Sequence, residues 1–388
     1  MTTTRKIMIV AGEASGDAHA AKLVNALRDA EPQTAFEFFG SAGPRMREAG
    51  VDAVVRADEL SIVGVAEIAL ALPMFLRASK QLKAVAVERK PDVVVLVDFP
   101  DFNLKLAKWL KKKGFTVVYY ISPQLWAWRK YRISAIRKYV DLLLTILPFE
   151  RDWYALHGVE HVEYVGNPLA NEVSASVSKQ EFCDRVGLDP EKPIVALLPG
   201  SRHKEIVRIL PVMLAAAAKM TKQQPDLQFV IAVARGRNCA DVDRAISEAH
   251  DLPKTLKIVE NDTYNAVAHS DAVAVTSGTA TLETGILGTP MVIVYTTSRL
   301  NYTLLKPMIS VEHYGLINLI AGKKVAKELI QHDFSPATVS TELFRLLEPA
   351  ANSATRKDLR AAREKLGSGG ASKRTAAAVL GLLDRSRR

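Results

Sequence analysis

An acidic side chain follows a strand-like segment in the first half of this sequence. Residues Val93–Val97 are all Val or Leu, and the chain continues as Asp98-Phe99-Pro100-Asp101. Such a run is typical of a parallel strand buried on both faces, and ligands bind at the carboxyl ends of these strands. Asp98 is therefore placed to accept a proton from an attacking hydroxyl group. Asp101, by contrast, can cap the helix expected from Phe102.

A second segment with ligand-binding character is Gly12–Asp17 (GEASGD), directly after the apolar run Lys6–Ala11. Its small residues would let backbone N–H groups at a helix start approach an anionic or sugar ligand. Its spacing is not that of the dinucleotide fingerprint G-x-G-x-x-G. An ordinary strand–helix turn is the alternative interpretation.

Two loops in the second half favour phosphate. Leu197–Ile206 (LLPGSRHKEI) and Thr276–Glu283 (TSGTATLE) each follow an apolar run and open a helix. Gly, Ser, Thr, Arg and Lys at helix starts suit phosphate oxygens. Two roles are open for Glu283. It accepts a hydrogen bond from a ribose hydroxyl, or it is a buried residue that caps a neighbouring element. Both loops are expected at the same edge of one sheet.

The elements that position these residues form an α/β pattern. Short apolar runs alternate with amphipathic helical stretches, which predicts two doubly wound, Rossmann-like sheets. The Pro- and Gly-containing stretch 167–192 separates them. We expect an N-terminal domain at residues 1–170, a C-terminal domain at 171–348 and basic C-terminal helices at 349–388. The expected strands are 6–11, 93–97, 115–121, 142–146, 194–198, 228–233, 256–259, 272–275 and 291–294.

Much of the positive charge lies at the C-terminal end. The formal net charge is +10, and residues 356–388 contain ten basic and three acidic side chains. This tail is either a solvated helix pair or a membrane contact. Its helices either pack back on the N-terminal domain or exchange with a partner chain in a homodimer.

Two segments favour a membrane surface. Leu60–Leu76 is almost wholly apolar but shorter than the roughly 20 residues that span a bilayer. It is either a buried helix or an exposed patch that enters the interface. Between Leu104 and Val140 there are ten Lys or Arg residues, no acid and seven Trp or Tyr residues, which suits an anionic membrane. No motif of a nucleic-acid-binding fold accompanies them.

Several classes are excluded by what the sequence lacks. Cys183 and Cys239 are the only cysteines, so there is no disulfide framework or Cys-rich metal site. No HExxH or GxxxxGK[ST] motif occurs, and we expect neither a metal nor another cofactor. The N-terminus lacks the apolar region of a secretory signal, so we expect a cytoplasmic protein.

Nine stretches, taken together and in order, resemble the lipid A disaccharide synthase family. They are IVAGEASGD, FFGSAGPRM, LSIVGVAEI, VDFPDFN, YYISPQLWAWR, LPFE, YVGNPL, LLPGSRHKEI and TSGTATLETGILGTPMVIVY. The resemblance extends from about Lys6 to about Leu347. It implies a GT-B-like pair of Rossmann domains facing a cleft and a glycosyltransferase that needs no metal.

The resemblance also implies a reaction and a site. UDP-2,3-diacylglucosamine and 2,3-diacylglucosamine 1-phosphate would give lipid A disaccharide 1-phosphate and UDP, with inversion at the sugar carbon. By the same resemblance, Asp98 is the base and Arg202 stabilises the leaving diphosphate. The substrate-binding positions that match the family are Glu13, Ser15, Ser277, Gly278, Thr279, Glu283 and Asn318. The sequence around Asn318, YGLINLIAG, departs from the usual V-S-L-P-N pattern.

Both implied substrates carry acyl chains, so the enzyme would act from the cytoplasm while attached peripherally to the inner membrane of a Gram-negative bacterium. Two same-fold alternatives are another lipid-linked-precursor glycosyltransferase and a sugar-nucleotide epimerase. An alternative of another class is a non-catalytic UDP-sugar-binding module.

Overall fold

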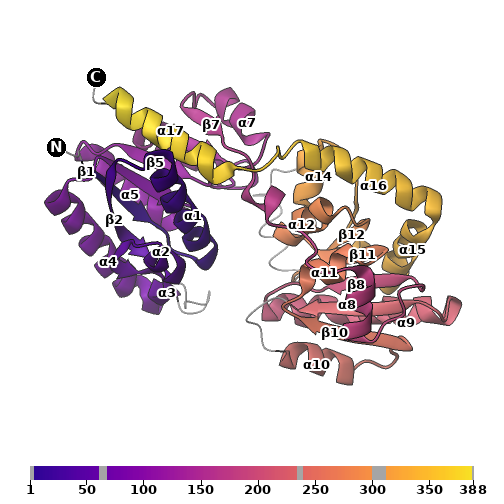
Figure 1. Ribbon diagram of the computed structural model, residues 1–388. Coiled ribbons are helices and arrows are strands. Elements are labelled where there is room, and N and C mark those ends of the chain that lie inside the picture. The colour runs from indigo at the N-terminus through magenta and orange to yellow at the C-terminus, as the bar shows by residue number, and fades with distance from the viewer. Residues whose placement is uncertain (1–3, 61–67, 234–238, 299–311, 387–388) are drawn as a thin grey trace. The chain divides into compact units, whose positions relative to one another are not determined.

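The protein is described here by a computed structural model that covers residues 4–60, 68–233, 239–298 and 312–386 (Figure 1). The chain divides into two compact units. Unit 1 comprises residues 1–168 and 369–388, and unit 2 comprises residues 169–368. The two-sheet α/β fold predicted from the sequence is confirmed.

Unit 1 contains a seven-stranded parallel sheet in the order β3-β2-β1-β4-β5-β6-β7. The strands are β1 (Thr4–Val10), β2 (Ala35–Ala42), β3 (Asp52–Arg56), β4 (Val93–Val97), β5 (Val117–Tyr120), β6 (Leu142–Thr145) and β7 (Val162–Tyr164). The helices are α1 (Ala14–Ala30), α2 (Pro44–Glu48), α3 (Ala57–Leu60), α4 (Ile68–Arg89), α5 (Pro100–Lys112), η2 (Lys130–Arg132), α6 (Ile133–Tyr139), α7 (Glu150–Leu156) and α17 (Ala371–Ser386).

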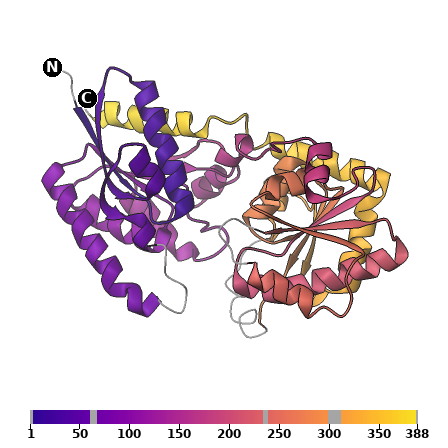
Figure 2. The same cartoon turned by 60° about the horizontal axis from the view of Figure 1, so that its bottom comes forward.

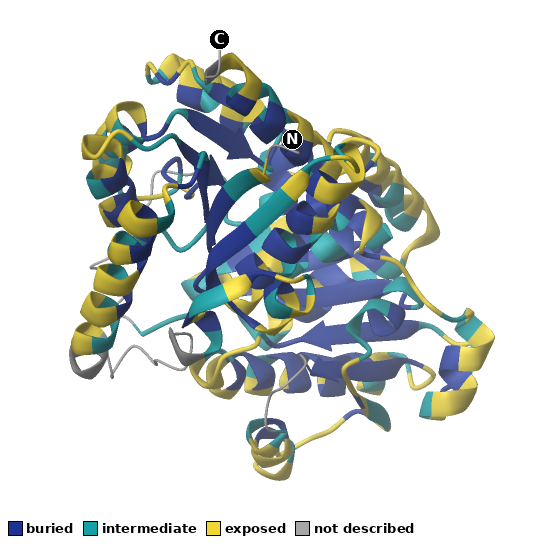
Figure 3. Ribbon diagram, turned by 60° about the vertical axis from the view of Figure 1, so that its left-hand side comes forward, coloured by how far each residue is buried: buried dark blue, intermediate teal, exposed yellow. Residues whose placement is uncertain are grey.

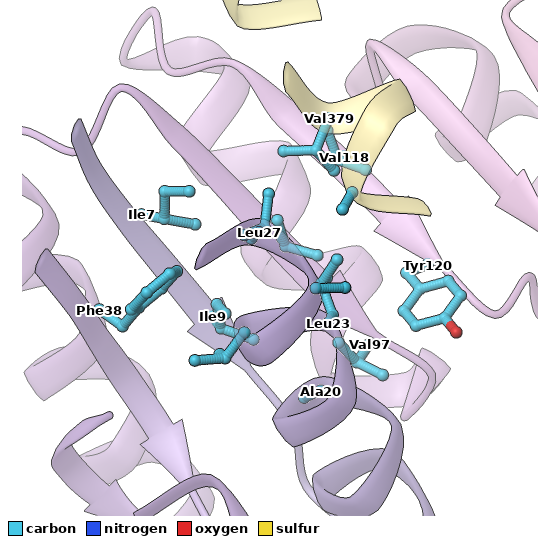
Figure 4. Close-up of a cluster of buried hydrophobic side chains, with 14 of the residues drawn as sticks. Ile7, Ile9, Ala20, Leu23, Leu27, Phe38, Val97, Val118, Tyr120 and Val379 are labelled. Atoms are coloured by element: carbon cyan, nitrogen blue, oxygen red, sulfur yellow. The ribbon is translucent and has the colours of Figure 1, made fainter. Parts of the chain in front are cut away.

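The alternation of side chains along β1 divides the core of unit 1 between two faces. Ile7 and Ile9 belong to a cluster with α1 and α17, whereas Met8 and Val10 belong to a cluster with α4, α5 and α6. Figure 4 shows the first cluster, in which Val379 of α17 lies near side chains of α1 and the sheet. The C-terminal helix therefore completes one face of the first sheet.

Unit 2 contains a six-stranded parallel sheet in the order β10-β9-β8-β11-β12-β13. The strands are β8 (Ile194–Leu198), β9 (Gln228–Val233), β10 (Thr255–Glu260), β11 (Ala272–Thr276), β12 (Met291–Tyr295) and β13 (Lys327–Ile330). The helical elements are η3 (Pro168–Asn171), α8 (Lys179–Val186), α9 (His203–Gln223), α10 (Ala240–Ser247), α11 (Thr263–Ala268), α12 (Thr279–Leu287), α14 (Leu316–Ala321), η5 (Gln331–Asp333), α15 (Pro336–Leu347) and α16 (Pro349–Glu364). Helices cover both sides of this sheet (Figure 2).

Burial follows the predicted pattern of parallel sheets. Every residue of β4, β8 and β11 is buried, and the helices alternate between buried and exposed positions (Figure 3). The two C-terminal helices divide between the units. Leu359 and Ala362 bury α16 in unit 2, whereas Val379 and Leu383 bury α17 in unit 1. Within the described ranges, no helix combines the length and apolarity needed to cross a membrane.

Candidate functional site

In unit 1 the predicted site residues lie where the strand order reverses. β1 and β4 are neighbours in the sheet, although residues 11–92 lie between them in the chain. The turn after β1 carries Glu13 and Ser15, and the turn after β4 carries Asp98. Ligands of doubly wound sheets bind at this switch point, at the carboxyl ends of the strands. The structure thus brings the two unit 1 motifs to one edge.

Asp98 occupies a strained turn between β4 and α5. Asp98 (φ 47°) and Phe99 (φ 51°) both have left-handed backbone, a conformation that costs a non-glycine residue about 1–3 kcal/mol. The Asp98 side chain is only partly exposed. Burial raises the pKa of its carboxyl to about 6, the charge of Glu13 adds to the rise, and a hydrogen bond from the Phe99 N–H opposes it. A carboxylate with this pKa is suited to accept a proton near neutral pH.

Phe99 connects this turn to the GEASGD segment. A Cβ atom added at Gly12 would lie 2.3 Å from Cδ1 of Phe99, so only glycine leaves room for the ring. On its other sides the ring centroid lies 6.0 Å from that of Phe75 and 5.5 Å from that of Phe102. Close packing thus couples the positions of the two turns.

The acidic residues of GEASGD have different environments. Glu13 is exposed at the N-cap of α1, and Ser15 is exposed in its first turn. Asp17 is buried, and its carboxylate accepts hydrogen bonds from the N–H groups of Gly43 (2.8 Å), Arg45 (2.9 Å) and Met46 (3.1 Å). Asp17 therefore caps α2, while Glu13 and Ser15 are exposed and the charge of Glu13 acts on Asp98.

In unit 2 the second pair of motifs lies at the equivalent switch point. β8 and β11 are neighbours, and the order of the sheet reverses between them. The PGSR turn follows β8, and the SGT turn follows β11. The sequence prediction that these loops share one edge of one sheet agrees with this strand order.

Arg202 is held by a carboxylate of its own helix. Its Nη1 donates to Oε1 of Glu205 at 2.7 Å, while 77% of the Arg202 side chain remains exposed. Oε2 of Glu205 accepts hydrogen bonds from the N–H groups of Ser201 (3.1 Å) and Arg202 (3.2 Å). Gly200 has φ 106° and lies against the same carboxylate. Glu205 thus occupies these two N–H groups, while most of the Arg202 guanidinium side chain remains exposed to an anion.

The SGT turn presents a helix N-terminus. Gly278 is the N-cap of α12 with φ 148° and ψ −160°, a backbone conformation that needs glycine. Thr279 is exposed as the first residue of the helix. The Ser277 hydroxyl donates to the Tyr314 carbonyl at 2.8 Å, and this hydrogen bond ties the turn to the segment before α14. First-turn N–H groups of a helix lack intrahelical acceptors and attract anions.

Glu283 lies on α12 and is paired with Tyr264 of α11. The Tyr264 hydroxyl donates to Oε1 of Glu283 at 2.9 Å. Burial raises the pKa of Glu283, and the Tyr264 hydrogen bond opposes that rise. One oxygen of the carboxylate is thereby oriented, which leaves the other as an acceptor for a hydroxyl group. In the part of the chain that the structure describes, no three His, Cys, Asp or Glu side chains are grouped to hold a metal ion.

A family model described as lipid-A-disaccharide synthetase matches residues 7–381. The chain belongs to this family. It is 43% identical over 383 residues to the lipid-A-disaccharide synthase of Trichlorobacter lovleyi, covering 98% of both chains. It is 41% identical over 382 residues to that of Geobacter sulfurreducens, again covering 98% of both. The predicted function, a glycosyltransferase of lipid A biosynthesis, is confirmed.

Solved structures share the fold at low sequence identity. A putative UDP-N-acetylglucosamine 2-epimerase from Listeria monocytogenes has a TM-score of 0.65 and 16% identity, covering 99% of this chain and 98% of its own. The calicheamicin glycosyltransferase CalG4 has a TM-score of 0.61 and 17% identity, covering 98% of this chain and 99% of its own. This member of the lipid-A-disaccharide synthetase family therefore has the GT-B type of fold.

Asn318 differs from the other predicted site residues because its amide is fully occupied. It is completely buried, and Nδ2 donates to the Ala326 carbonyl (2.8 Å) and to Oε1 of Glu328 (2.9 Å). Oδ1 accepts from the N–H groups of Val325 and Ala326, both at 2.9 Å. An asparagine can make four hydrogen bonds, and these are four. Asn318 therefore ties α14 to the segment 325–328, and its amide has no hydrogen-bonding capacity left for a substrate.

The basic and aromatic segment separates into core and surface. Tyr119, Tyr120 and Trp126 are buried, whereas Trp128 is 42% and Tyr131 is 71% exposed. Arg129 and Arg132 both form ion pairs with Asp101, which does not cap α5 but lies exposed in its first turn. Although partial burial opposes it, these arginines lower the pKa of Asp101.

The apolar segment Leu60–Leu76 is described only in part. Residues 61–67 lie outside the described residues, and α4 begins at Ile68. Leu72 (55%) and Leu76 (62%) are exposed one helical turn apart on α4. These two side chains form an exposed apolar pair. Met74 and Phe75, which lie between them in the sequence, pack on the core instead.

Sequence reasoning missed the buried residues that hold the turns. Glu150, in the LPFE stretch, accepts from Nε1 of Trp126 (3.0 Å) and from the Leu147 N–H (3.1 Å). Burial raises its pKa to about 7, against the hydrogen bonds from Trp126 and the Leu147 N–H. Asn103 and Tyr119, which bind the Asp98 turn, were also missed. The signal available was a polar residue inside an otherwise apolar stretch, which indicates a buried hydrogen-bonding role.

Proposed function

We propose that this protein transfers the sugar of UDP-2,3-diacylglucosamine to the 6-hydroxyl of 2,3-diacylglucosamine 1-phosphate. The hydroxyl oxygen attacks C1 of the donor on the face opposite UDP and gives its proton to Asp98. The bond between C1 and the diphosphate oxygen breaks, and UDP leaves as an anion. The product is lipid A disaccharide 1-phosphate, with inverted configuration at C1.

The observation that carries this proposal is the pair Asp98 and Arg202, each at the switch point of its own parallel sheet. Asp98 combines partial burial with a pKa raised to about 6, as a general base requires. Arg202 presents a mostly exposed guanidinium at the start of α9, where a leaving diphosphate can be stabilised. A proton acceptor and an anion stabiliser are the two groups that an inverting transfer needs.

In this proposal unit 2 binds the nucleotide. The first-turn N–H groups of α12 at Gly278 and Thr279 bind the diphosphate, and Ser277 shapes that turn through Tyr314. The free oxygen of Glu283 accepts a ribose hydroxyl. Glu13 and Ser15, both exposed at the start of α1, bind the acceptor sugar in unit 1.

Peripheral attachment to the cytoplasmic face of the inner membrane of a Gram-negative bacterium is part of the proposal, because both substrates are acylated. The exposed side chains Leu72, Leu76, Trp128 and Tyr131 support it. In the described part of unit 1, Lys105, Lys108 and Lys130 form no ion pair and would attract anionic lipid.

The test is incubation of the purified protein with both acylated substrates, followed by mass spectrometry of UDP and the tetra-acylated disaccharide. The proposal predicts equal amounts of the two products. A parallel reaction uses UDP-N-acetylglucosamine alone. Conversion of that compound to its 2-epimer without disaccharide formation would show an epimerase, and binding without any turnover would show a non-catalytic module.

A further inference from the structure

The backbone of the Asp98 turn is held by side chains that make no bond to its carboxylate. Asp98 and Phe99 are consecutive non-glycine residues with φ 47° and φ 51°. Strained backbone of this kind persists only where the surrounding structure over-determines it. The neighbouring contacts of the turn therefore indicate what enforces it.

Two buried donors converge on the Asp98 carbonyl oxygen. Nδ2 of Asn103 donates to it at 2.8 Å, and the hydroxyl of Tyr119 donates to it at 2.7 Å. Both side chains have no exposed surface. The Asp98 N–H donates to the Tyr120 carbonyl at 3.0 Å. The peptide groups on both sides of the Asp98 Cα are thus fixed by hydrogen bonds.

The two donors come from different elements and so tie the turn to the rest of the unit. Asn103 lies in the first turns of α5, where Nδ2 also approaches the Val97 carbonyl at 3.2 Å. Tyr119 lies on β5, the next strand of the sheet. Because the direction of the Asp98 Cα–Cβ bond follows from its backbone, fixing the carbonyl fixes the point from which the carboxylate extends.

We propose that Asn103 and Tyr119 are positioning residues of the transfer reaction, which hold Asp98 in its left-handed conformation at the point where the acceptor hydroxyl loses its proton. This inference rests on the proposed role of Asp98 as the base. Both residues act through the Asp98 backbone, and a misplacement of about 1 Å at a reacting group can cost about 100-fold in rate.

Removing one donor should have a recognisable signature. The turn relaxes and the carboxylate moves toward water, so kcat falls while substrate binding is retained. Since burial is the main cause of the raised pKa of Asp98, a more exposed carboxylate ionises at lower pH. The acid limb of the kcat profile should shift downward.

The experiment compares Tyr119→Phe with Tyr154→Phe in the full-length protein. Tyr154 is a matched control, because it is also fully buried and its hydroxyl donates to a backbone carbonyl, that of Pro123, at 2.8 Å. For Tyr119→Phe we expect kcat to fall about tenfold, both KM values to stay within about twofold, and the acid limb to move down. For Tyr154→Phe we expect the same loss of melting temperature but an unchanged kcat and acid limb.

A double-mutant cycle separates positioning from general destabilisation. In an Asp98→Asn background, Tyr119→Phe should cause no further loss of kcat, because the base it positions is gone. If the two losses multiply instead, Tyr119 acts elsewhere and the inference is overturned. Should Tyr119→Phe fail to fold, Asn103→Leu, which is similar in size but has no donor, takes its place in the same comparisons.

The outcomes also distinguish this inference from the function on which it rests. If Asp98→Asn itself keeps turnover within a few-fold of wild type, the base assignment fails and the positioning role fails with it. If Asp98→Asn is nearly inactive while Tyr119→Phe and Asn103→Leu keep the wild-type kcat and acid limb, only the positioning role is wrong.

Discussion

The two units place their site residues by the same topology but with opposite charge. In unit 1 the neighbouring strands β1 and β4 end in turns that carry Glu13 and Asp98. In unit 2 the neighbouring strands β8 and β11 end in turns that carry Arg202 and the N-terminus of α12. The first edge is suited to accept a proton, and the second is suited to bind an anion. The fold fixes where chemistry can occur, and a few side chains in the turns decide which chemistry it is.

The turns also reach their shapes differently. The Asp98 turn has two non-glycine residues at positive φ and is held by Asn103 and Tyr119. The unit 2 turns use glycine at positive φ, at Gly200 and Gly278, where such backbone costs little. In unit 1, hydrogen bonds hold a strained backbone that carries a carboxylate. In unit 2, the glycines leave room for a ligand to approach the backbone.

The largest effect is expected from a substitution at the acidic edge, which is the edge of the unit 1 sheet that carries Glu13 and Asp98. Asp98→Asn keeps the size of the side chain but removes proton acceptance, so kcat should fall by roughly 10²–10⁴. Steady-state assays of UDP release measure this loss. Asp101→Asn is the control, since Asp101 is exposed and paired with Arg129 and Arg132, and it should stay within a few-fold of wild type. Equal losses in both variants would remove the special role of Asp98.

A smaller effect is expected at the basic edge, which is the edge of the unit 2 sheet that carries Arg202 and the N-terminus of α12. Arg202→Lys keeps the charge but loses the planar guanidinium and its contact with Glu205, so kcat/KM for the donor should fall about tenfold or more. Arg208→Lys, an exposed position on the same helix, should have no effect. Unchanged kinetics for Arg202→Lys would mean that any positive charge suffices there.

The pH profile sharpens the account of the acidic edge. Asp98 must be ionised to accept a proton, so kcat should fall about tenfold per pH unit below a pKa of about 6 and level off above it. Glu13→Gln removes the charge that helps to raise this pKa, so the acid limb should move to lower pH. The acceptor phosphate also titrates at about pH 6, and its pKa in free solution does not depend on residue 13. An acid limb that stays in place in Glu13→Gln would assign it to the substrate.

The last prediction concerns membrane binding, where we expect the smallest effect on catalysis. Replacing both Leu72 and Leu76 with Ser should weaken sedimentation with anionic phospholipid vesicles several-fold, because apolar side chains that enter the interface are lost. The melting temperature should change little, since both side chains are exposed. Leu156→Ser, at an 85% exposed position on α7, is the control and should bind vesicles normally. Full vesicle binding by the double variant would move the contact surface elsewhere.

Local patterns in the sequence predicted the positions of the site turns, whereas the burial of their neighbours depended on tertiary contacts. The apolar run before Asp98 placed it at a strand end, as the structure has it. Tyr119, Tyr120 and Trp126 were counted among the aromatic residues that suit a membrane surface, although Tyr119 and Tyr120 also fall in the expected strand 115–121. The sheet and its helices bury all three. The packing of α17 on α1 joins residues that are far apart in the chain. The hydrogen bonds of Asn318 depend on the conformation of one loop. No periodicity within a segment can reveal such contacts.

Calorimetric titration of UDP into Asp98→Asn and Arg202→Ala tests the central claim most directly, namely that the acidic edge carries proton transfer and the basic edge carries nucleotide binding. The account predicts that Asp98→Asn binds UDP within about twofold of wild type while its turnover collapses. Arg202→Ala should bind UDP at least about tenfold more weakly, because a charge-assisted contact to the diphosphate is lost. Weakened UDP binding in Asp98→Asn together with unchanged binding in Arg202→Ala would contradict the division of roles between the two edges.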